Sequence, residues 1–292
     1  MNRRAFFATT AASGLAVSAS APAQKPVEKK ARLRTAICAY SFREELKSGK
    51  MTYADLVRLA VELDVDGLDL TVYWFPEKLD GFLMPLKQLA FRSAVELCSI
   101  SIRSNCCQPT AEKQAAEVAG LRHWVDVADK LGAGHIRVFG GTVPKGSTED
   151  QAAGWVVEVL KRGAEYAGTK GVTLGLENHG GITERAERII QIVKTVDSPW
   201  LGINADTGNF RKDAYNQLRM LLPYAVNSQV KVEIMDENGQ RQKADWDRII
   251  RMFAEASYKG YFSLEYEAAE PAPIAVPRLT RELNALARKY SG

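Results

Sequence analysis

The stretch "TLGLENHGG" (173–181) joins a short apolar run to a cluster of polar side chains. The apolar part has the length and character of a buried strand, and Glu177, Asn178 and His179 follow where such a strand would end. The chain has only three histidines. A histidine two residues after a carboxylate therefore marks either a polar loop or one corner of a metal site.

The same sequence pattern recurs along the chain from residue 34 onward. Short apolar runs end in polar residues, and each is followed by a longer stretch with helical periodicity. Continuous apolar strands of this kind are typical of a parallel sheet that is buried on both faces. The eight runs are "RTAICAYSF" (34–42), "VDGLDLTVY" (65–73), "CSISIRSN" (98–105), "HIRVFGG" (135–141), "VTLGLENH" (172–179), "LGINADTGN" (201–209), "SQVKVEI" (228–234) and "YFSLEYE" (261–267).

The stretches between these runs are predicted to be helices. Thr52, with Asp55 three residues later, forms a plausible N-cap. Ser147 is a candidate N-cap for the helix expected after the fourth run, and Gly171 stands just beyond its end. The predicted helices lie at 52–63, 111–131, 147–171, 183–195, 213–222, 246–258 and 275–290.

Eight strand-then-helix units predict a single-domain α/β protein, a (β/α)8 TIM barrel, over residues 33–292. A doubly wound sheet is the structural alternative. It usually has fewer strands and a glycine-rich phosphate turn after the first strand, and "CAYSFREE" (38–45) has no such turn.

The first 23 residues have the order of an export signal. A positive start with Arg3 and Arg4 leads into a weakly apolar stretch and then a small-residue cleavage site. The paired arginines are similar to a twin-arginine (Tat) signal, although Asn2 and Ala8 depart from its usual pattern. An ordinary secretory signal and an uncleaved anchor are the alternatives. We expect a linker at 24–32, a periplasmic or exported mature protein, and no stable membrane insertion after cleavage.

Composition favours a soluble enzyme over a nucleic-acid binder. The chain is 46% hydrophobic and 25% charged, with a formal net charge of +4. A nucleic-acid binder gathers Lys and Arg with aromatic residues on one face, whereas the charges here are spread through helical stretches. We therefore expect a small-molecule substrate and no nucleic-acid partner, while a homo-oligomer remains open.

In a parallel barrel the catalytic groups lie at the carboxyl ends of the strands. Four consecutive runs place an oxygen donor there: Glu177, Asp206, Gln229 and Glu265. Three carboxylates gathered at one mouth would repel one another strongly without a cation. Oxygen-rich sites suit Mg²⁺ or Mn²⁺ better than Zn²⁺. The sequence therefore predicts a divalent metal held by these four residues.

Four motifs together resemble the xylose-isomerase-like TIM-barrel superfamily of sugar (phosphate) isomerases and epimerases. They are "LGLENHGG", "GINADTGN", "QVKV" before "DW" (245–246), and "GYFSLEYE", and the resemblance covers about residues 33–290. It implies a metal held by Glu177, Asp206, the position of Gln229, and Glu265. Gln229 stands where the family usually has His. The hydroxypyruvate isomerase branch resembles this sequence in having Gln there. We expect Mn²⁺, with Mg²⁺ or Co²⁺ as alternatives.

The resemblance also implies that Glu177 and Glu265 are the acid/base pair. One would remove a proton next to a carbonyl and the other would return it, through an enediolate. Further residues near the strand ends are predicted to contact a keto- or aldo-sugar: His179, Lys231, Asn209, Tyr40, Trp74 and Arg137.

Two other functions remain open. A metal-dependent lyase or hydratase could act on a 3-keto-sugar or glycoside by the same proton abstraction, and a sugar-binding barrel would have no turnover. Endonuclease IV shares the fold but needs several zinc-binding histidines. Only His179 is suitably placed, because His123 lies in a helical stretch and His135 at the start of a strand.

Overall fold

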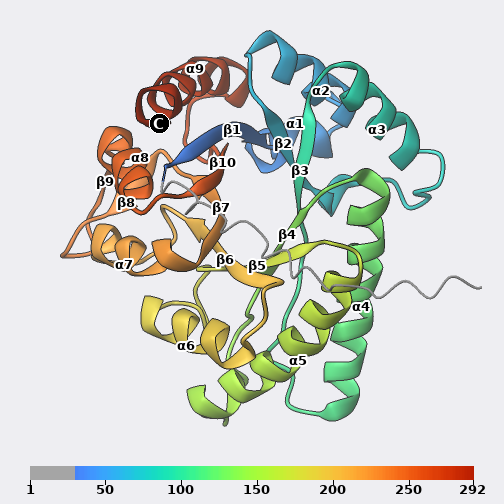
Figure 1. Cartoon of the computed structure of the whole chain (residues 1–292), viewed down its shortest axis with the longest axis vertical. Coiled ribbons are helices and arrows are strands. Elements are labelled where there is room, and N and C mark those ends of the chain that lie inside the picture. The colour runs from blue at the N-terminus through green and yellow to red at the C-terminus, as the bar shows by residue number, and fades with distance from the viewer. Residues whose placement is uncertain (1–29) are drawn as a thin grey trace, which may run out of the picture.

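The computed structural model describes residues 30–292, and these form one closed barrel surrounded by helices (Figure 1). The predicted export signal (1–23) and most of the predicted linker lie outside the described residues. Within the described part of the chain, none of the helices has both the length and the apolar content needed to cross a bilayer.

Eight parallel strands close the barrel in the order β1-β10-β7-β6-β5-β4-β3-β2. All eight predicted strands are present, which confirms the (β/α)8 fold and its single domain. The strands are β1 (Arg32–Cys38), β2 (Gly67–Thr71), β3 (Glu96–Ser101), β4 (His135–Phe139), β5 (Thr173–Glu177), β6 (Leu201–Asp206), β7 (Ala225–Val230) and β10 (Lys259–Leu264).

Helices form the outer ring around these strands (Figure 1). The main ones are α2 (Tyr53–Glu62), α3 (Leu83–Arg92), α4 (Ala111–Leu131), α5 (Glu149–Thr169), α6 (Ala186–Val196), α7 (Ala214–Leu221), α8 (Trp246–Glu255) and α9 (Ala272–Tyr290). Shorter pieces are α1 (Arg43–Lys47) and the 3₁₀ turns η1 (Ala39–Phe42), η2 (Val72–Trp74) and η3 (Leu222–Tyr224). Each main helix buries one apolar face, and together with the outward side chains of the strands these faces make the hydrophobic core.

Side-chain caps begin several helices, and one of them is a cap that the sequence predicts. The Thr52 hydroxyl accepts from the backbone N–H of Asp55, and the Asp55 carboxylate accepts from the backbone N–H of Thr52, which completes a capping box. The prediction of Ser147 as the cap of α5 is wrong by one residue. Thr148 holds that position, because its hydroxyl accepts from the backbone N–H of Gln151.

A helix and a hairpin are the main elements that were not predicted. Helix α3 buries Leu83, Leu86 and Ala90, but it also exposes Met84 and Phe91, so apolar residues on both sides conceal its amphipathic pattern. A hairpin of β8 (Glu233–Met235) and β9 (Arg241–Lys243) extends the chain after β7. Its strands have three residues each, which is too short for a period of two to stand out.

The barrel interior is polar near its carboxyl end. Gln229 on β7 donates to Asp69 on β2 (3.2 Å), and these strands are not neighbours, so the bond runs across the interior. The apolar residues instead alternate outward: Leu174 faces Gly163 of α5 while Glu177 faces inward. Buried polar residues that take part in the interior contacts are Asp69, Ser101, Arg137, Glu177, Asn204, Asp206, Asn227, Gln229, Lys231 and Glu265.

His135 fills the opposite end of the interior. Its Nδ1 is 2.8 Å from Ser99 Oγ, and its ring occupies space that a side chain at Gly175 would need, since a Cβ there would lie 2.2 Å from Nε2. Nε2 has no hydrogen-bond partner. Burial, reinforced by the positive charge of Arg137, lowers the pKa of His135 to about 3.

We predict an acid-sensitive contribution of His135 to stability. The folded protein keeps the imidazole neutral, while the unfolded chain protonates it below about pH 6.5, so stability falls as pH decreases from about 6.5 to 3. The slope from this group is about 1.4 kcal/mol per pH unit. Denaturant unfolding at several pH values measures it. His135→Gln should remove this slope and His123→Gln, on the surface of α4, should keep it; equal slopes in all three proteins would contradict the prediction.

Candidate active site

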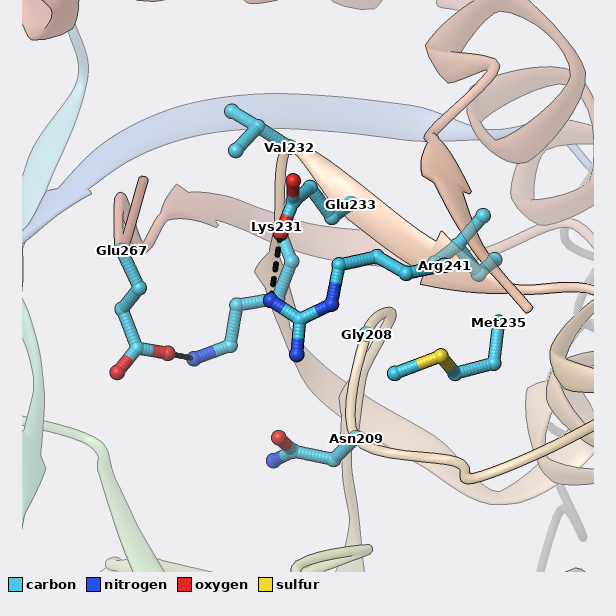
Figure 2. A pocket seen from close by; sticks show the side chains of 9 residues that line it. Gly208, Asn209, Lys231, Val232, Glu233, Met235, Arg241 and Glu267 are labelled. Carbon is cyan, nitrogen blue, oxygen red and sulfur yellow. Dashed lines mark hydrogen bonds and ion pairs between the residues drawn. The ribbon is translucent and has the colours of Figure 1, made fainter. Parts of the chain in front are cut away.

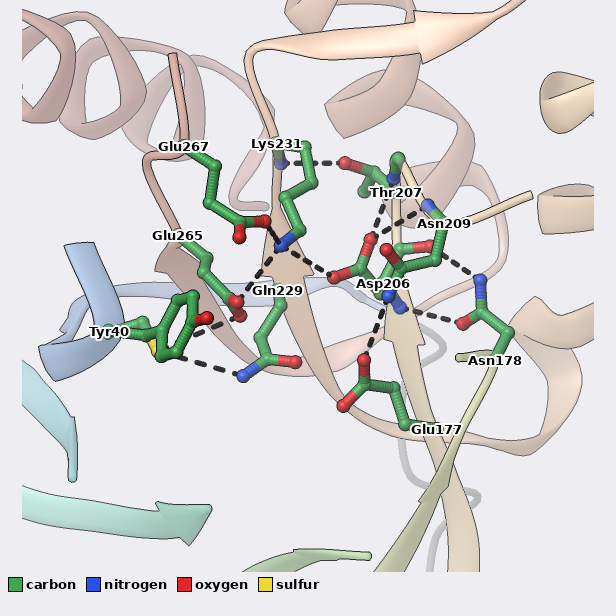
Figure 3. Close-up of polar contacts among 12 residues, drawn as sticks. Tyr40, Glu177, Asn178, Asp206, Thr207, Asn209, Gln229, Lys231, Glu265 and Glu267 are labelled. Carbon is green, nitrogen blue, oxygen red and sulfur yellow. Dashed lines mark hydrogen bonds and ion pairs between the residues drawn. The ribbon is translucent and has the colours of Figure 1, made fainter. Parts of the chain in front are cut away.

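Four strand ends bring their polar side chains to the carboxyl mouth of the barrel (Figure 3). Glu177 is the last residue of β5, Asp206 is the last of β6, and Glu265 follows directly after β10. Gln229 lies one residue before the end of β7. All four are buried, with exposed fractions of 8% or less. The structure therefore gathers these side chains at one site, as their positions at strand ends predict.

Lys231 lies among three of the carboxylates (Figure 3). Its Nζ is 2.9 Å from Glu265 Oε1 and 3.5 Å from Asp206 Oδ2, and it also forms a close ion pair with Glu267. Gly208 makes room for the lysine stem, because a Cβ at that position would lie 2.6 Å from Lys231 Cγ. The ammonium thus neutralises part of the negative charge at the centre of the site.

Glu177 has two partners of its own. Arg137 Nε lies 2.8 Å from Glu177 Oε2, and Asn209 Nδ2 donates to Glu177 Oε1 at 2.9 Å. Arg137 is also occupied elsewhere, since its Nη1 donates to the carbonyl of Ile102 and its Nη2 to the hydroxyl of Tyr73. These contacts hold the Glu177 carboxylate in one orientation.

Asp206 is positioned through its backbone. The side chain of Asn178 donates to the carbonyl of Asp206 at 2.8 Å and accepts from its N–H at 2.9 Å. Asp206 Oδ1 accepts from the backbone N–H groups of Gly208 and Asn209, whereas Oδ2 has no hydrogen-bond partner. Burial, opposed by Lys231, raises the pKa of Asp206 to about 7.

Gln229 lies deeper in the barrel than the carboxylates beside it. Its Oε1 accepts from Asn204 Nδ2 at 2.9 Å, and Asn204 in turn accepts from Asn227. Its Nε2 donates to Asp69 and, at 3.4 Å, to Ser101 Oγ. The amide is held at both ends by interior groups, so ligation of a metal by Gln229 stays a prediction.

The two carboxylates predicted to be the acid/base pair have different electrostatic surroundings. Burial raises the pKa of Glu177 well above its usual value; Arg137 opposes this shift and Asp206 adds to it. Burial also acts to raise the pKa of Glu265, but the positive charges of Lys231 and Arg137 outweigh it and the net shift is downward. Without a bound cation, the two groups therefore differ in their affinity for a proton.

The donors fit a divalent cation in kind and in charge. Four carboxylates, those of Glu177, Asp206, Glu265 and Glu267, face the two cations Lys231 and Arg137, which leaves two formal negative charges unbalanced. Asp206 Oδ2 has no hydrogen-bond partner and is met only by the Lys231 ammonium at 3.5 Å. Among the described residues, however, no three His, Cys, Asp or Glu side chains converge closely enough to hold a metal. The Lys231 ammonium lies between the carboxylates of Asp206, Glu265 and Glu267.

The predicted sugar contacts lie around this centre. Exposed His179 stacks on Phe139, with ring centroids 4.1 Å apart. Tyr40 and Trp74 belong to an aromatic cluster on the β1–β2 side, where their centroids are 5.9 Å apart. Asn209 and Lys231 are next to the carboxylates, and Arg137 is buried among protein partners.

Two hollows flank the carboxylates. One of about 150 Å³ opens beside the hairpin, and Figure 2 shows Asn209, Lys231 and Glu267 on its wall with Arg241 of β9. The other, of about 230 Å³, is lined by residues at or after the ends of β3, β4 and β5, among them His179. A ligand spanning the mouth would touch residues from both.

Sequence reasoning missed Glu267 and gave no role to Asn178. Glu267 stands two residues after Glu265, so alternation in an extended chain places the two side chains on the same side. That signal was present in "LEYE" (264–267). Asn178 gave no comparable signal, because its bonds to the backbone of Asp206 depend on the register of neighbouring strands.

Comparison with known proteins agrees with the fold. The family model described as "Xylose isomerase-like TIM barrel" matches residues 57–289. No curated protein matches the sequence significantly.

Solved structures with the same fold have low sequence identity to this chain. D-psicose 3-epimerase from Clostridium cellulolyticum H10, solved with D-tagatose, is 16% identical, with a TM-score of 0.71 over 88% of this chain and 99% of that one. A probable 3-DHS dehydratase from Bacillus anthracis is 15% identical, with a TM-score of 0.65 over 87% of this chain and 98% of that one. A xylose isomerase-like TIM barrel protein from Mycobacterium smegmatis, in complex with magnesium, is 18% identical, with a TM-score of 0.65 over 88% of this chain and 98% of that one.

We predict that the buried pair of Arg137 and Glu177 contributes strongly to stability. Arg137→Met leaves the Glu177 carboxylate buried without its counter-ion and should cost about 3–5 kcal/mol of unfolding free energy in metal-free protein near pH 8. Denaturant unfolding measures the loss. Adding Glu177→Gln to this variant should recover much of it. Arg185→Met breaks an exposed pair with Glu149 and should cost at most about 1 kcal/mol; a similar loss in both arginine variants would contradict the prediction.

Proposed function

Because this chain belongs to the xylose isomerase-like TIM barrel family, we propose that it is a divalent-metal-dependent sugar isomerase or epimerase. The observation that carries the proposal is the surplus of carboxylates over cations where β5, β6 and β10 end. Burying carboxylates is unfavourable unless cations or hydrogen bonds compensate them. Such a surplus suits a site that receives a divalent cation and a substrate with several oxygens.

Glu177, Asp206 and Glu265 would hold the metal, with Gln229 as a fourth ligand if its amide turns toward the mouth. When bound, the metal would act as a Lewis acid and stabilise negative charge that develops on the substrate oxygens. Mn²⁺ is the ion we favour, because the donors are hard oxygens; Mg²⁺ and Co²⁺ are the alternatives.

Glu177 and Glu265 would transfer the proton. They approach the site from β5 and β10, which are separated in the barrel by β6 and β7, so they would flank a bound sugar. Arg137 and Asn209 keep the Glu177 carboxylate in place. One carboxylate removes the proton next to the carbonyl and the other protonates the enediolate.

The residues around the mouth would bind the sugar. His179 is exposed and its ring is held by Phe139, so it can donate a hydrogen bond to a hydroxyl group. Tyr40 and Trp74 offer aromatic faces on the opposite side. We also propose that the protein works outside the cytoplasm, on the basis of its N-terminal sequence.

Hydrogen exchange with solvent tests the two-carboxylate scheme. Manganese-loaded protein in D₂O, with a panel of free ketoses and aldoses, should convert one sugar pair and place deuterium at the reacting carbon. Glu177→Gln and Glu265→Gln should each slow conversion by about 10²-fold or more. If the sugars are epimers, each variant should still exchange deuterium into one epimer and not the other, because only one face keeps its base.

Metal content of each variant must be measured alongside, since both residues are also predicted ligands. Glu149→Gln, at an exposed position on α5, is the control for a change of charge. Absence of both conversion and exchange with every sugar would contradict the proposal and would favour a sugar-binding barrel.

A lyase or hydratase remains the second candidate, because a probable 3-DHS dehydratase is among the proteins of similar fold. The same base could remove the proton from a 3-keto-sugar or glycoside, after which a group leaves from the neighbouring carbon. In the D₂O experiment with a 3-keto-glycoside, an unsaturated sugar would support elimination. Deuterated starting material and its isomer, without elimination, would support the first proposal.

A further inference from the structure

The ammonium of Lys231 occupies the place where the carboxylates of this site come nearest to one another. Its Nζ contacts Asp206, Glu265 and Glu267, and the lysine side chain is only 10% exposed. The inner carboxylates belong to buried Asp206 and Glu265, whereas Glu267 lies at the rim with a side chain that is 40% exposed. One cation is therefore shared between two inner acceptors and one outer acceptor.

A divalent cation at the two inner carboxylates would compete directly with this ammonium. Both are positive and both need oxygens of Asp206 and Glu265, and repulsion between charges a few ångströms apart is poorly screened in a buried site. Binding of the metal thus requires the ammonium to move away from the inner oxygens.

The structure provides an outer position for the displaced group. The backbone of Lys231 is fixed, because its N–H donates to Thr207 Oγ1 and its carbonyl accepts from Trp246 Nε1. The end of the side chain, in contrast, borders the hollow of about 150 Å³ whose wall includes Glu267 (Figure 2). A small movement of the flexible stem would leave the ammonium paired with Glu267 alone.

We propose that Lys231 is an internal counter-ion that is displaced by the metal, and that Glu267 is a positioning residue that receives its ammonium. This inference rests on the proposed metal site but concerns how that site is kept neutral when no metal is bound. It makes the metal affinity of the chain depend on two residues outside the predicted ligand set. Glu267 would favour metal binding without touching the metal.

Isothermal titration of metal-stripped protein with Mn²⁺ tests the proposal. Lys231→Met removes the competing charge and should bind Mn²⁺ more tightly, by on the order of tenfold. Glu267→Gln removes the outer acceptor and should weaken binding by roughly threefold to tenfold. In the double variant, Glu267→Gln should have no further effect, because Glu267 acts only through Lys231.

Glu233→Gln is a matched control, since Glu233 is a carboxylate on the wall of the same hollow and pairs with Arg241 instead of Lys231. It should leave Mn²⁺ affinity within about twofold of the wild type. Weaker or equal binding by Lys231→Met would overturn the proposal. So would an equal effect of Glu267→Gln in the wild-type and Lys231→Met backgrounds, which would make Glu267 a direct ligand.

Thermal unfolding gives a second measurement in case Lys231→Met folds poorly without metal. This variant should melt at a lower temperature than the wild type in EDTA and gain more from added Mn²⁺. An equal gain would count against the proposal. These assays contain no sugar, so their outcome is separate from the proposed reaction. If the Mn²⁺ affinities change as predicted but no sugar is converted, only the proposed reaction is rejected. If sugar is converted but the variants bind Mn²⁺ like the wild type, only the counter-ion role of Lys231 is rejected.

Discussion

The structure depends on how a closed barrel tolerates carboxylates in its interior. Water cannot freely screen charges there, so every negative group must find a cation or a donor within the protein. Arg137 serves Glu177 and Lys231 serves Asp206 and Glu265, while backbone N–H groups of the β6–α7 loop complete the shell of Asp206. The network still leaves more negative than positive charge. That imbalance links the fold to the chemistry we propose.

Much of the fold can be predicted from the sequence, because a parallel barrel repeats one pattern eight times. A buried strand needs a continuous apolar run and its helix needs an amphipathic stretch. Because this pattern recurs, one missed helix or strand does not change the predicted fold. Helix α3 escaped prediction because Met84 and Phe91 face solvent and erase its polar side. The hairpin escaped because strands of three residues carry too little pattern.

The site is only partly predictable for a different reason. Position at a strand end identifies Glu177, Asp206 and Glu265, since the carboxyl ends of parallel strands meet at one mouth. The depth of each side chain in the barrel and its hydrogen-bond partners depend on strand register and on rotamers, which the sequence does not reveal. Gln229 therefore lies in a polar chain with Asn204 and Asp69 below the carboxylates. For the same reason the sequence does not reveal that three acidic groups surround the Lys231 ammonium.

Asn178 has a consequence for the rigidity of the mouth. Its amide bonds to both backbone groups of Asp206 and so continues the pairing of β5 with β6 beyond Glu177, the last residue of β5. The height of Asp206 relative to Glu177 is thereby set by covalent geometry and hydrogen bonds of neutral groups, which do not respond to ions. If the proposed metal binds and leaves, the scaffold can therefore keep its dimensions, and only side-chain ends need to adjust.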